Sequence, residues 1–228
     1  MPSQSVASNT REAKKSPGRN RRLPPEVREK QIIEGAIEFF AEKGFNGDTR
    51  ALAAHLGITH SLLFKYFPNK EILIDRVYEE VFVGRWNPYW EMLIGDRTIP
   101  LLERLTKVYQ SYYNAIKAYE WVRLFMFAGL KGSELNKRWL KFVVDHLVQP
   151  ICVEIRHEFG LASLEDKPLQ EMEKELVLGV SSRLVALCIR SHIYSVGVPN
   201  NCARLIELEV LTFYEGAKLA WPTLVSND

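Results

Sequence analysis

The stretch from Phe45 to Phe67 constrains the fold of this chain more than any other. It contains two short segments with a helical spacing of apolar residues, separated by Leu56-Gly57-Ile58. A turn containing Gly between two short helices is typical of a helix-turn-helix, whose second helix enters a DNA groove. Gly at the end of a short helix can adopt the left-handed conformation that stops it. The stretch therefore predicts a helix-turn-helix.

Polar residues that can cap helices flank both segments. Asp48 or Thr49 can cap the first helix and Thr59 the second, because their side-chain oxygens can accept an unpaired backbone N–H. The outward residues of the second helix carry hydroxyls, an imidazole and an ammonium, which suit base edges and phosphates. They are Thr59, His60, Ser61, Lys65 and Tyr66. An ordinary pair of packed helices with solvated outer faces is the alternative.

Residues 28 to 75 resemble the N-terminal DNA-binding domain of TetR-family transcriptional regulators. The resemblance rests on Gly44-Phe45, Thr49-Arg50, Leu52-Ala53, Leu56-Gly57-Ile58-Thr59, Leu63-Phe64, Tyr66-Phe67, Lys70-Glu71 and Leu73. Two departures concern DNA contacts and helix bounds. Phe64 stands where the family usually has Tyr, which removes a hydroxyl that could reach a phosphate. The loop from Gly44 to Leu52 is about one residue shorter than usual, which affects the start of the first short helix.

The resemblance implies a double-stranded DNA operator as a partner and a set of residues that contact it. Carried over to this sequence, those positions are Thr49, Arg50, Thr59, His60, Ser61, Lys65, Tyr66 and Lys70. Lys70 would stand at the start of the next helix, where an ammonium and the helix N–H groups can act on the same phosphate. A solvated lysine is the alternative for this residue.

Charge is distributed unevenly along the 228 residues. The formal net charge of +2 is too small to indicate a nucleic-acid binder, but residues 1–25 alone carry a net +5. This basic segment has too few apolar residues to fold, so we expect a disordered arm over residues 1–24. It either contacts phosphates or a minor groove, or is a solubilising or cloning-derived segment.

Proline and glycine mark the ends of the predicted helices. Pro25 favours the start of a first long helix, which we expect to run to about Lys43 with Gly44 as its C-cap. Pro68 favours the next start, and the apolar spacing predicts a helix that continues past Phe82. No convincing strand pattern occurs, so the expected fold class is all-α.

The aromatic residues are concentrated in the middle of the chain, with 14 of 25 between Tyr78 and Phe142. Trp and Tyr carry polar groups that need partners, which favours a cavity for a ring-bearing or amphipathic molecule over a dry core, the alternative. Arg123 is a lone cation that would allow a carboxylate on that molecule. The candidate ligand-binding residues are Trp86, Trp90, Tyr109, Tyr113, Trp121, Arg123, Phe125, Phe142 and His146.

Three long helices are expected after residue 132. The first runs from Ser133 to about Phe159 with a kink at Pro150. The second runs from Pro168 to about Gly197, and the third from Asn200 or Asn201 to about Trp221. One side of the second carries a seam able to meet a neighbouring helix. It consists of Leu169, Met172, Leu176, Val180, Leu184, Leu187, Ser191 and Tyr194.

The resemblance implies how these parts divide the chain. Residues 25–69 would form the helix-turn-helix DNA-binding domain, and residues 70–228 a helical ligand-binding and dimerisation domain. The last two helices of each chain would build a four-helix homodimer interface. The ligand itself stays unidentified, because the family's pockets vary too much to transfer residue by residue.

Other site classes find little support in the sequence. His146 and His157, with Glu154 and Glu158 nearby, lack the i, i+4 spacing of a His pair on one metal ion. Three scattered cysteines suit reduced thiols of a cytoplasmic protein better than disulfides or zinc. No apolar run reaches the length of a membrane span. No catalytic or phosphate-binding motif occurs, so we expect no enzyme activity, cofactor or metal.

Three functions remain open at this point. The first is a ligand-responsive homodimeric transcriptional regulator, in the form of a repressor that a small, largely apolar molecule releases from its operator. The second is a DNA-binding regulator of the same fold without a small-molecule effector. The third is an all-helical enzyme that uses the aromatic cavity, for which no acid, base or nucleophile constellation can be assembled.

Overall fold

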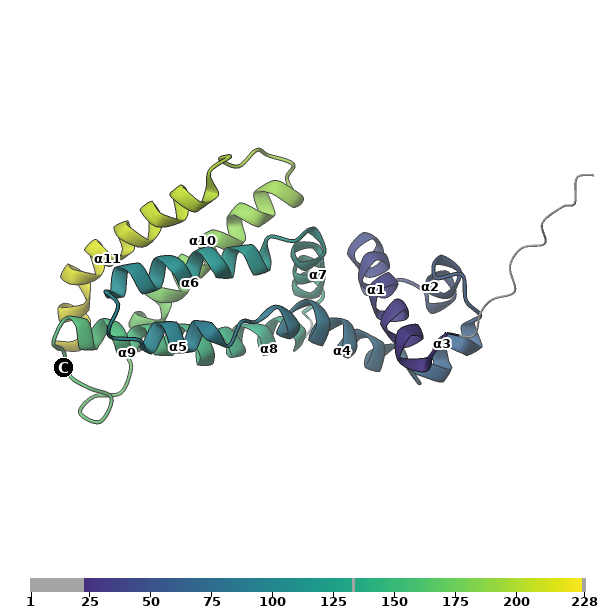
Figure 1. Ribbon diagram of the computed structural model, residues 1–228, viewed down its shortest axis with the longest axis horizontal. Helices are drawn as coiled ribbons and strands as arrows, with labels where there is room; N and C mark the ends of the chain where they lie inside the picture. Colours follow the sequence, from purple (N-terminus) through teal and green to yellow (C-terminus); the bar gives the residue numbers. More distant parts are fainter. Residues whose placement is uncertain (1–22, 133, 227–228) are drawn as a thin grey trace, which may run out of the picture.

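The computed structural model describes residues 23–132 and 134–226, and this part of the chain is helical without a strand (Figure 1). The all-α prediction is confirmed. Three helices form a small unit at one end, and α4 leads from it into a larger helical body. Their bounds are α1 Pro25–Lys43, α2 Thr49–His55, α3 His60–Tyr66 and α4 Lys70–Val81. The predicted basic arm lies outside the described residues, apart from its last two.

The body contains the remaining helices. They are α5 Tyr89–Gly95, α6 Leu101–Ile116, α7 Tyr119–Leu130, α8 Glu134–Val143, α9 Gln149–Glu158, α10 Glu171–His192 and α11 Cys202–Ser226. α10 and α11 pack against each other and on α6 along one side of the body (Figure 1). α7 packs on α1 and so joins the body to the small unit. The core is continuous across both parts and buries Trp90, Trp121 and Trp221 completely or nearly so.

Two predicted helix ends before α10 need correction. α4 ends at Val81 instead of continuing past Phe82, and a 3-10 turn, Val83–Arg85, follows it. The helix expected from Ser133 to Phe159 is α8 and α9, separated by a π-helical turn, Val144–Val148. Pro150 lies in the first turn of α9. Because Pro150 has no backbone N–H to donate to the preceding turn, the hydrogen-bond pattern changes directly before it.

The two C-terminal helices also differ from their predicted bounds. α10 begins at Glu171 instead of Pro168, because Gln170 and Glu173 form a reciprocal capping box there. It ends at His192, before the predicted Gly197. α11 starts after Asn201, whose side chain accepts the backbone N–H of Arg204 at 3.0 Å. It continues beyond Trp221 to Ser226 with Pro222 inside it.

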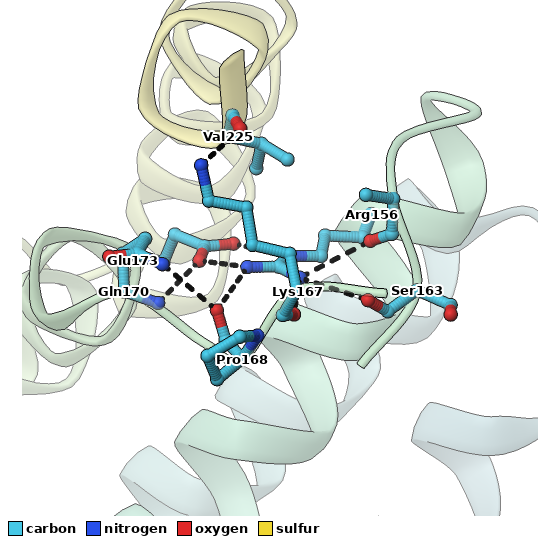
Figure 2. Close-up of polar contacts among 8 residues, drawn as sticks. Arg156, Ser163, Lys167, Pro168, Gln170, Glu173 and Val225 are labelled. Atoms are coloured by element: carbon cyan, nitrogen blue, oxygen red, sulfur yellow. Dashed lines mark hydrogen bonds and ion pairs between the residues drawn. The ribbon is translucent and has the colours of Figure 1, made fainter. Parts of the chain in front are cut away.

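A buried ion pair fixes the segment before α10. The Arg156 guanidinium donates two hydrogen bonds to the Glu173 carboxylate, at 2.7 and 2.5 Å. It also donates to the carbonyls of Lys167 and Pro168, at 2.6 and 3.0 Å (Figure 2). The two side chains are 2% and 0% exposed. The bidentate geometry ties α9 to α10 and holds Lys167 and Pro168 outside the helix.

Candidate nucleic-acid interface and ligand cavity

Short-range hydrogen bonds define the helix-turn-helix. The Asp48 side chain accepts the backbone N–H of Arg50 at 3.2 Å and caps α2. Thr59 Oγ1 accepts the N–H of Leu62 at 3.2 Å and caps α3. Gly57 has a φ of +63°, in the left-handed region that favours glycine. Both predicted caps and the glycine turn are therefore confirmed.

Close packing on α1 supports this unit. Leu52, Ala53 and Leu63 are buried and form the inner face of α2 and α3. A Cβ atom at Gly35 of α1 would lie 2.3 Å from Leu56 Cδ2. A side chain at position 35 would therefore require the Leu56 side chain to move. Sequence reasoning missed Gly35, although a glycine inside a long helix signals a close contact of this kind.

The outer surface of α2 and α3 carries the side chains expected to contact DNA. Arg50, Thr59, Ser61 and Lys65 are exposed, and His60 and Tyr66 are half-buried. These polar side chains are therefore at least partly exposed on the surface of the helix-turn-helix, as the sequence predicted.

His60 has contacts that sequence reasoning did not anticipate. Its Nε2 atom lies 3.0 Å from Thr49 Oγ1 and forms a hydrogen bond across the two helices. Its ring meets the Phe64 ring edge to face at 4.7 Å between centroids. The Phe at position 64 therefore supports the imidazole from within α3. Thr49 and His60 form a joined pair in which each orients the other.

Lys70 occupies the N-terminus of α4, next to the turn before α2. Its Nζ atom donates to the Gly47 carbonyl at 2.8 Å. Burial and the nearby Lys131 ammonium lower the pKa of Lys70. An ammonium has three donors, so two stay available for a phosphate. Asn69 caps the same helix by accepting the N–H of Ile72 at 2.8 Å.

A polar junction connects α7 of the body with α1. Arg123 Nε donates to the Ala41 carbonyl at 2.5 Å, and the Tyr119 hydroxyl donates to Glu42 at 2.6 Å. The Arg123 guanidinium lies over the Tyr119 and Phe127 rings, 5.4 and 5.3 Å from their centroids. The structure thus places Arg123 at the junction and away from the cavity described below.

The other predicted ligand residues mostly contact one another. Trp86 meets Trp90, Phe142 and His146 at centroid distances of 4.7, 4.9 and 6.1 Å. His146 Nδ1 bonds to Glu91 at 3.0 Å. Tyr109 is buried and its hydroxyl donates to the Val177 carbonyl at 3.4 Å. These aromatic rings therefore pack against one another along α5, α8 and the π turn.

Tyr113 and Trp121 also lie outside the cavity. The Tyr113 hydroxyl donates to Cys202 Sγ at 3.4 Å, between α6 and α11. Trp121 is buried and stacks on Phe125, with centroids 5.0 Å apart and planes 12° apart. Phe125 alone among the nine predicted residues lines the cavity.

The cavity lies where α6, α7 and α8 face α10. Its volume is about 180 Å³. Tyr112, Trp139, Val143 and Ser181 are its buried residues, whereas Leu140, Ser182 and Ala186 are exposed at its mouth. The full lining is Tyr112, Phe125, Trp139, Leu140, Val143, Leu178, Ser181, Ser182, Val185, Ala186 and Ile189. Serine on an otherwise apolar helix face, here at Ser181, is the sequence signal that could have indicated α10.

Metal-binding clusters and membrane-spanning helices are absent from the described part of the chain. No group of three or more His, Cys, Asp or Glu side chains is placed there to hold a metal ion. No helix of that part combines the length and apolarity that crossing a membrane requires. The three cysteines are free thiols, and burial raises the pKa of Cys152 and Cys188 to about 12.

Comparison with known proteins places the first helices in a family. Residues 32–77 match the family model described as bacterial regulatory proteins, tetR family. No curated protein is significantly similar in sequence to the chain.

Several solved structures share the fold. A TetR-like transcriptional regulator from Rhodococcus sp. RHA1 is 19% identical, with a TM-score of 0.60 over 86% of this chain and 100% of that one. A putative transcriptional regulator from Pseudomonas aeruginosa PAO1 is 17% identical, with a TM-score of 0.65 over 90% and 96%. AmtR from Mycobacterium smegmatis is 17% identical, with a TM-score of 0.58 over 85% and 88%.

Proposed function

This chain belongs to the TetR family of DNA-binding transcriptional regulators, and on that premise we propose that it is a homodimeric repressor released from its operator by a small apolar molecule. Regulators of this family are DNA-binding proteins without enzymatic activity. Residues 25–69 would read DNA, and residues 70–228 would bind the effector and the second subunit.

DNA reading is assigned to the exposed side of α2 and α3. Two recognition helices of a dimer would enter successive major grooves, with the N-terminal residues of α3 at base edges. We assign base contacts to the Thr49–His60 pair and Ser61. Arg50, Lys65, Tyr66 and Lys70 are exposed or half-buried and are assigned to phosphates, together with the Thr59 cap.

The proposal of effector control rests on helix α7, which contributes both to the cavity and to the contact with α1. Phe125 lines the cavity, while Arg123 and Tyr119 of the same helix hold α1. A molecule that displaces Phe125 therefore strains the helix that positions the DNA-reading unit. It acts only through different affinities for two dimer geometries, and a hundredfold loss of DNA affinity requires about 2.7 kcal/mol of that difference.

The dimer surface is assigned to the exposed apolar residues of the C-terminal helices. Met172 and Leu176 lie on α10, and Leu208, Leu211 and Leu219 on α11, all exposed in the single chain. Leu184 and Leu187 of the predicted seam are instead buried within their own subunit. The seam therefore contributes residues to the chain's own core and to the surface. An apolar surface of this kind on two neighbouring helices suits a second copy of the chain.

The test compares operator and random DNA by fluorescence anisotropy, with and without a fraction of hydrophobic metabolites. We expect the fraction to weaken operator binding by the wild type. Arg123→Ala should keep operator binding but lose part of this response, because the α7–α1 contact is broken. Lys137→Ala, which removes an exposed cation of α8, serves as a control. Equal binding to operator and random DNA would contradict the sequence-specific assignment.

The packing of the aromatic rings around Trp86 against one another favours a second candidate function. In it, the chain is a regulator of the same fold whose DNA binding no small molecule changes. The same titration separates the two candidates. Specific operator binding that stays constant across the whole metabolite fraction supports the second.

A further inference from the structure

We infer that the cavity under α10 takes a neutral molecule with one aromatic ring and one hydroxyl group, such as a simple phenol. Its regulatory consequence rests on the proposed function, whereas the binding site itself does not. Size, charge, wall chemistry and one buried hydroxyl each restrict the ligand, and all four come from residues that line the cavity.

Size restricts the ligand to about one ring. A dry protein cavity of about 150 Å³ lined by apolar side chains holds one benzene molecule. The cavity here measures about 180 Å³. One ring with a small substituent therefore fits, and the mouth beside Leu140, which is 43% exposed, provides an entry path. Larger fused ring systems would have to project out of it.

Charge restricts the ligand to a neutral form. None of the eleven lining residues is an Asp, Glu, Lys, Arg or His. Arg123, the cation that the sequence offered for a carboxylate, is bonded to the Ala41 carbonyl at the junction. A carboxylate or ammonium in the cavity would be desolvated without a partner, which is strongly unfavourable.

The walls favour a flat ring. Tyr112, Phe125 and Trp139 supply aromatic surface from α6, α7 and α8. Aliphatic side chains of α10, among them Leu178, Val185 and Ile189, supply the opposite side. An aromatic ring between such walls gains edge-to-face contacts in addition to burial of its apolar surface.

Ser181 supplies the polar recognition. It is 2% exposed, and its hydroxyl makes no hydrogen bond of ordinary geometry within the described residues. It lies beside the Tyr109 hydroxyl, close enough to act on the pKa of that phenol. The neighbouring Tyr109 hydroxyl instead donates to the Val177 carbonyl. A buried hydroxyl without a partner is unfavourable. A ligand hydroxyl that bonds to Ser181 would remove this penalty and fix the orientation of the ring.

The experiment measures binding of three probes of matched shape to the full-length protein by calorimetry at pH 7. They are 4-methylphenol, para-xylene and para-toluate, which differ in one substituent. We expect 4-methylphenol to bind about 2- to 12-fold more tightly than para-xylene, as one neutral hydrogen bond gives. Para-toluate should bind at least about 100-fold more weakly than 4-methylphenol.

Two variants and a control assign the effect to the cavity. Ser181→Ala should abolish the preference for 4-methylphenol over para-xylene, while both still bind. Ser182→Ala, one residue away at the exposed mouth, should keep the preference. Val143→Phe should fill the cavity and remove binding of both. Equal affinity of the wild type for 4-methylphenol and para-xylene, or binding that Ser181→Ala leaves unchanged, would overturn the inference.

Operator DNA separates this inference from the proposed function. If 4-methylphenol binds with the expected pattern but leaves operator affinity unchanged, the site stands and the effector role fails. If no neutral aromatic probe binds while another metabolite weakens operator binding, the effector role stands and this inference fails.

Discussion

The helix-turn-helix unit and the body of this protein differ in how far apart in sequence their stabilising residues lie. The caps of α2, α3 and α4 join residues two or three positions apart. In the body, Arg156 and Glu173 are 17 positions apart, and Arg104 and Glu154 are 50 apart. The comparison teaches that the DNA-reading unit can be derived from a short window of sequence. The sensing body depends on pairings that no short window contains.

The first prediction tests the long-range interactions of the body by removing one partner of a buried ion pair. Arg156→Met leaves the Glu173 carboxylate buried without its cation, which should lower the free energy of unfolding by about 3–5 kcal/mol. Arg138→Ala is the matched control, since Arg138 is 46% exposed in its pairs with Asp75 and Glu79. It should cost at most about 1 kcal/mol. Urea unfolding followed by tryptophan fluorescence measures both, and equal losses would contradict the assignment.

The second prediction concerns how stability depends on pH through the same long-range ion pairs. Burial alone would raise the pKa of Glu154 and Glu173, but hydrogen bonds from arginines lower both below the ordinary 4.5. Because the folded values are depressed, this stabilisation is complete above about pH 4.5 and is lost as the pH falls further. At pH values below 4.5, the melting temperature of the protein should therefore decrease. Glu154→Gln should flatten the drop, and an unchanged pH profile in that variant would contradict it.

The sequence predicted the short-range features of the DNA-reading unit because their causes are local. The Asp48 and Thr59 caps and the left-handed Gly57 depend on residues within one helical turn. The predicted start of α10 was wrong because the actual start depends on Arg156, a residue outside that helix. Pro168 suits the first turn of a helix, but its carbonyl accepts a hydrogen bond from Arg156, and the capping box begins only at Gln170.

The cavity could not be located from sequence for the same physical reason. Aromatic density indicated α5 to α8, and Tyr112, Phe125 and Trp139 of that region do line the cavity, but the rings around Trp86 pack against one another. The void instead forms where small side chains of α10, such as Ser181 and Ala186, face Tyr112 and Trp139. Tyr112 and Trp139 stand 69 and 42 positions before Ser181, so no short window of sequence shows this pairing.

The third prediction separates the chain's own core from its proposed dimer surface. Leu176→Glu alters a residue exposed on α10, so the subunit should stay folded while the dimer dissociation constant rises at least about 100-fold. Leu184→Glu places the charge in the subunit core and should unfold the chain. Light scattering and circular dichroism distinguish the two results. A stable dimer in the Leu176 variant would place the interface elsewhere.

The fourth prediction sharpens the local side of the comparison by separating base readers from phosphate contacts. His60→Ala should weaken preference at one base-pair position by about 1–3 kcal/mol. Lys65→Ala should weaken binding to all sequences alike and reduce the slope of log affinity against log salt by about one. Anisotropy titrations over a range of salt and operator variants measure both. Identical effects of the two changes would contradict the division of roles.

The smallest effect expected is that of a single cap. Thr59→Ala removes the oxygen that accepts the Leu62 N–H, and loss of such a cap costs about 1 kcal/mol. Thr59→Ser keeps the oxygen and should restore most of the stability, which assigns the effect to the hydrogen bond. Because the cap spans three residues, hydrogen exchange should rise at the start of α3 and stay unchanged at the Arg156–Glu173 pair. Faster exchange throughout the body would show that the DNA-reading unit is not stabilised locally, and the contrast between the two regions would fail.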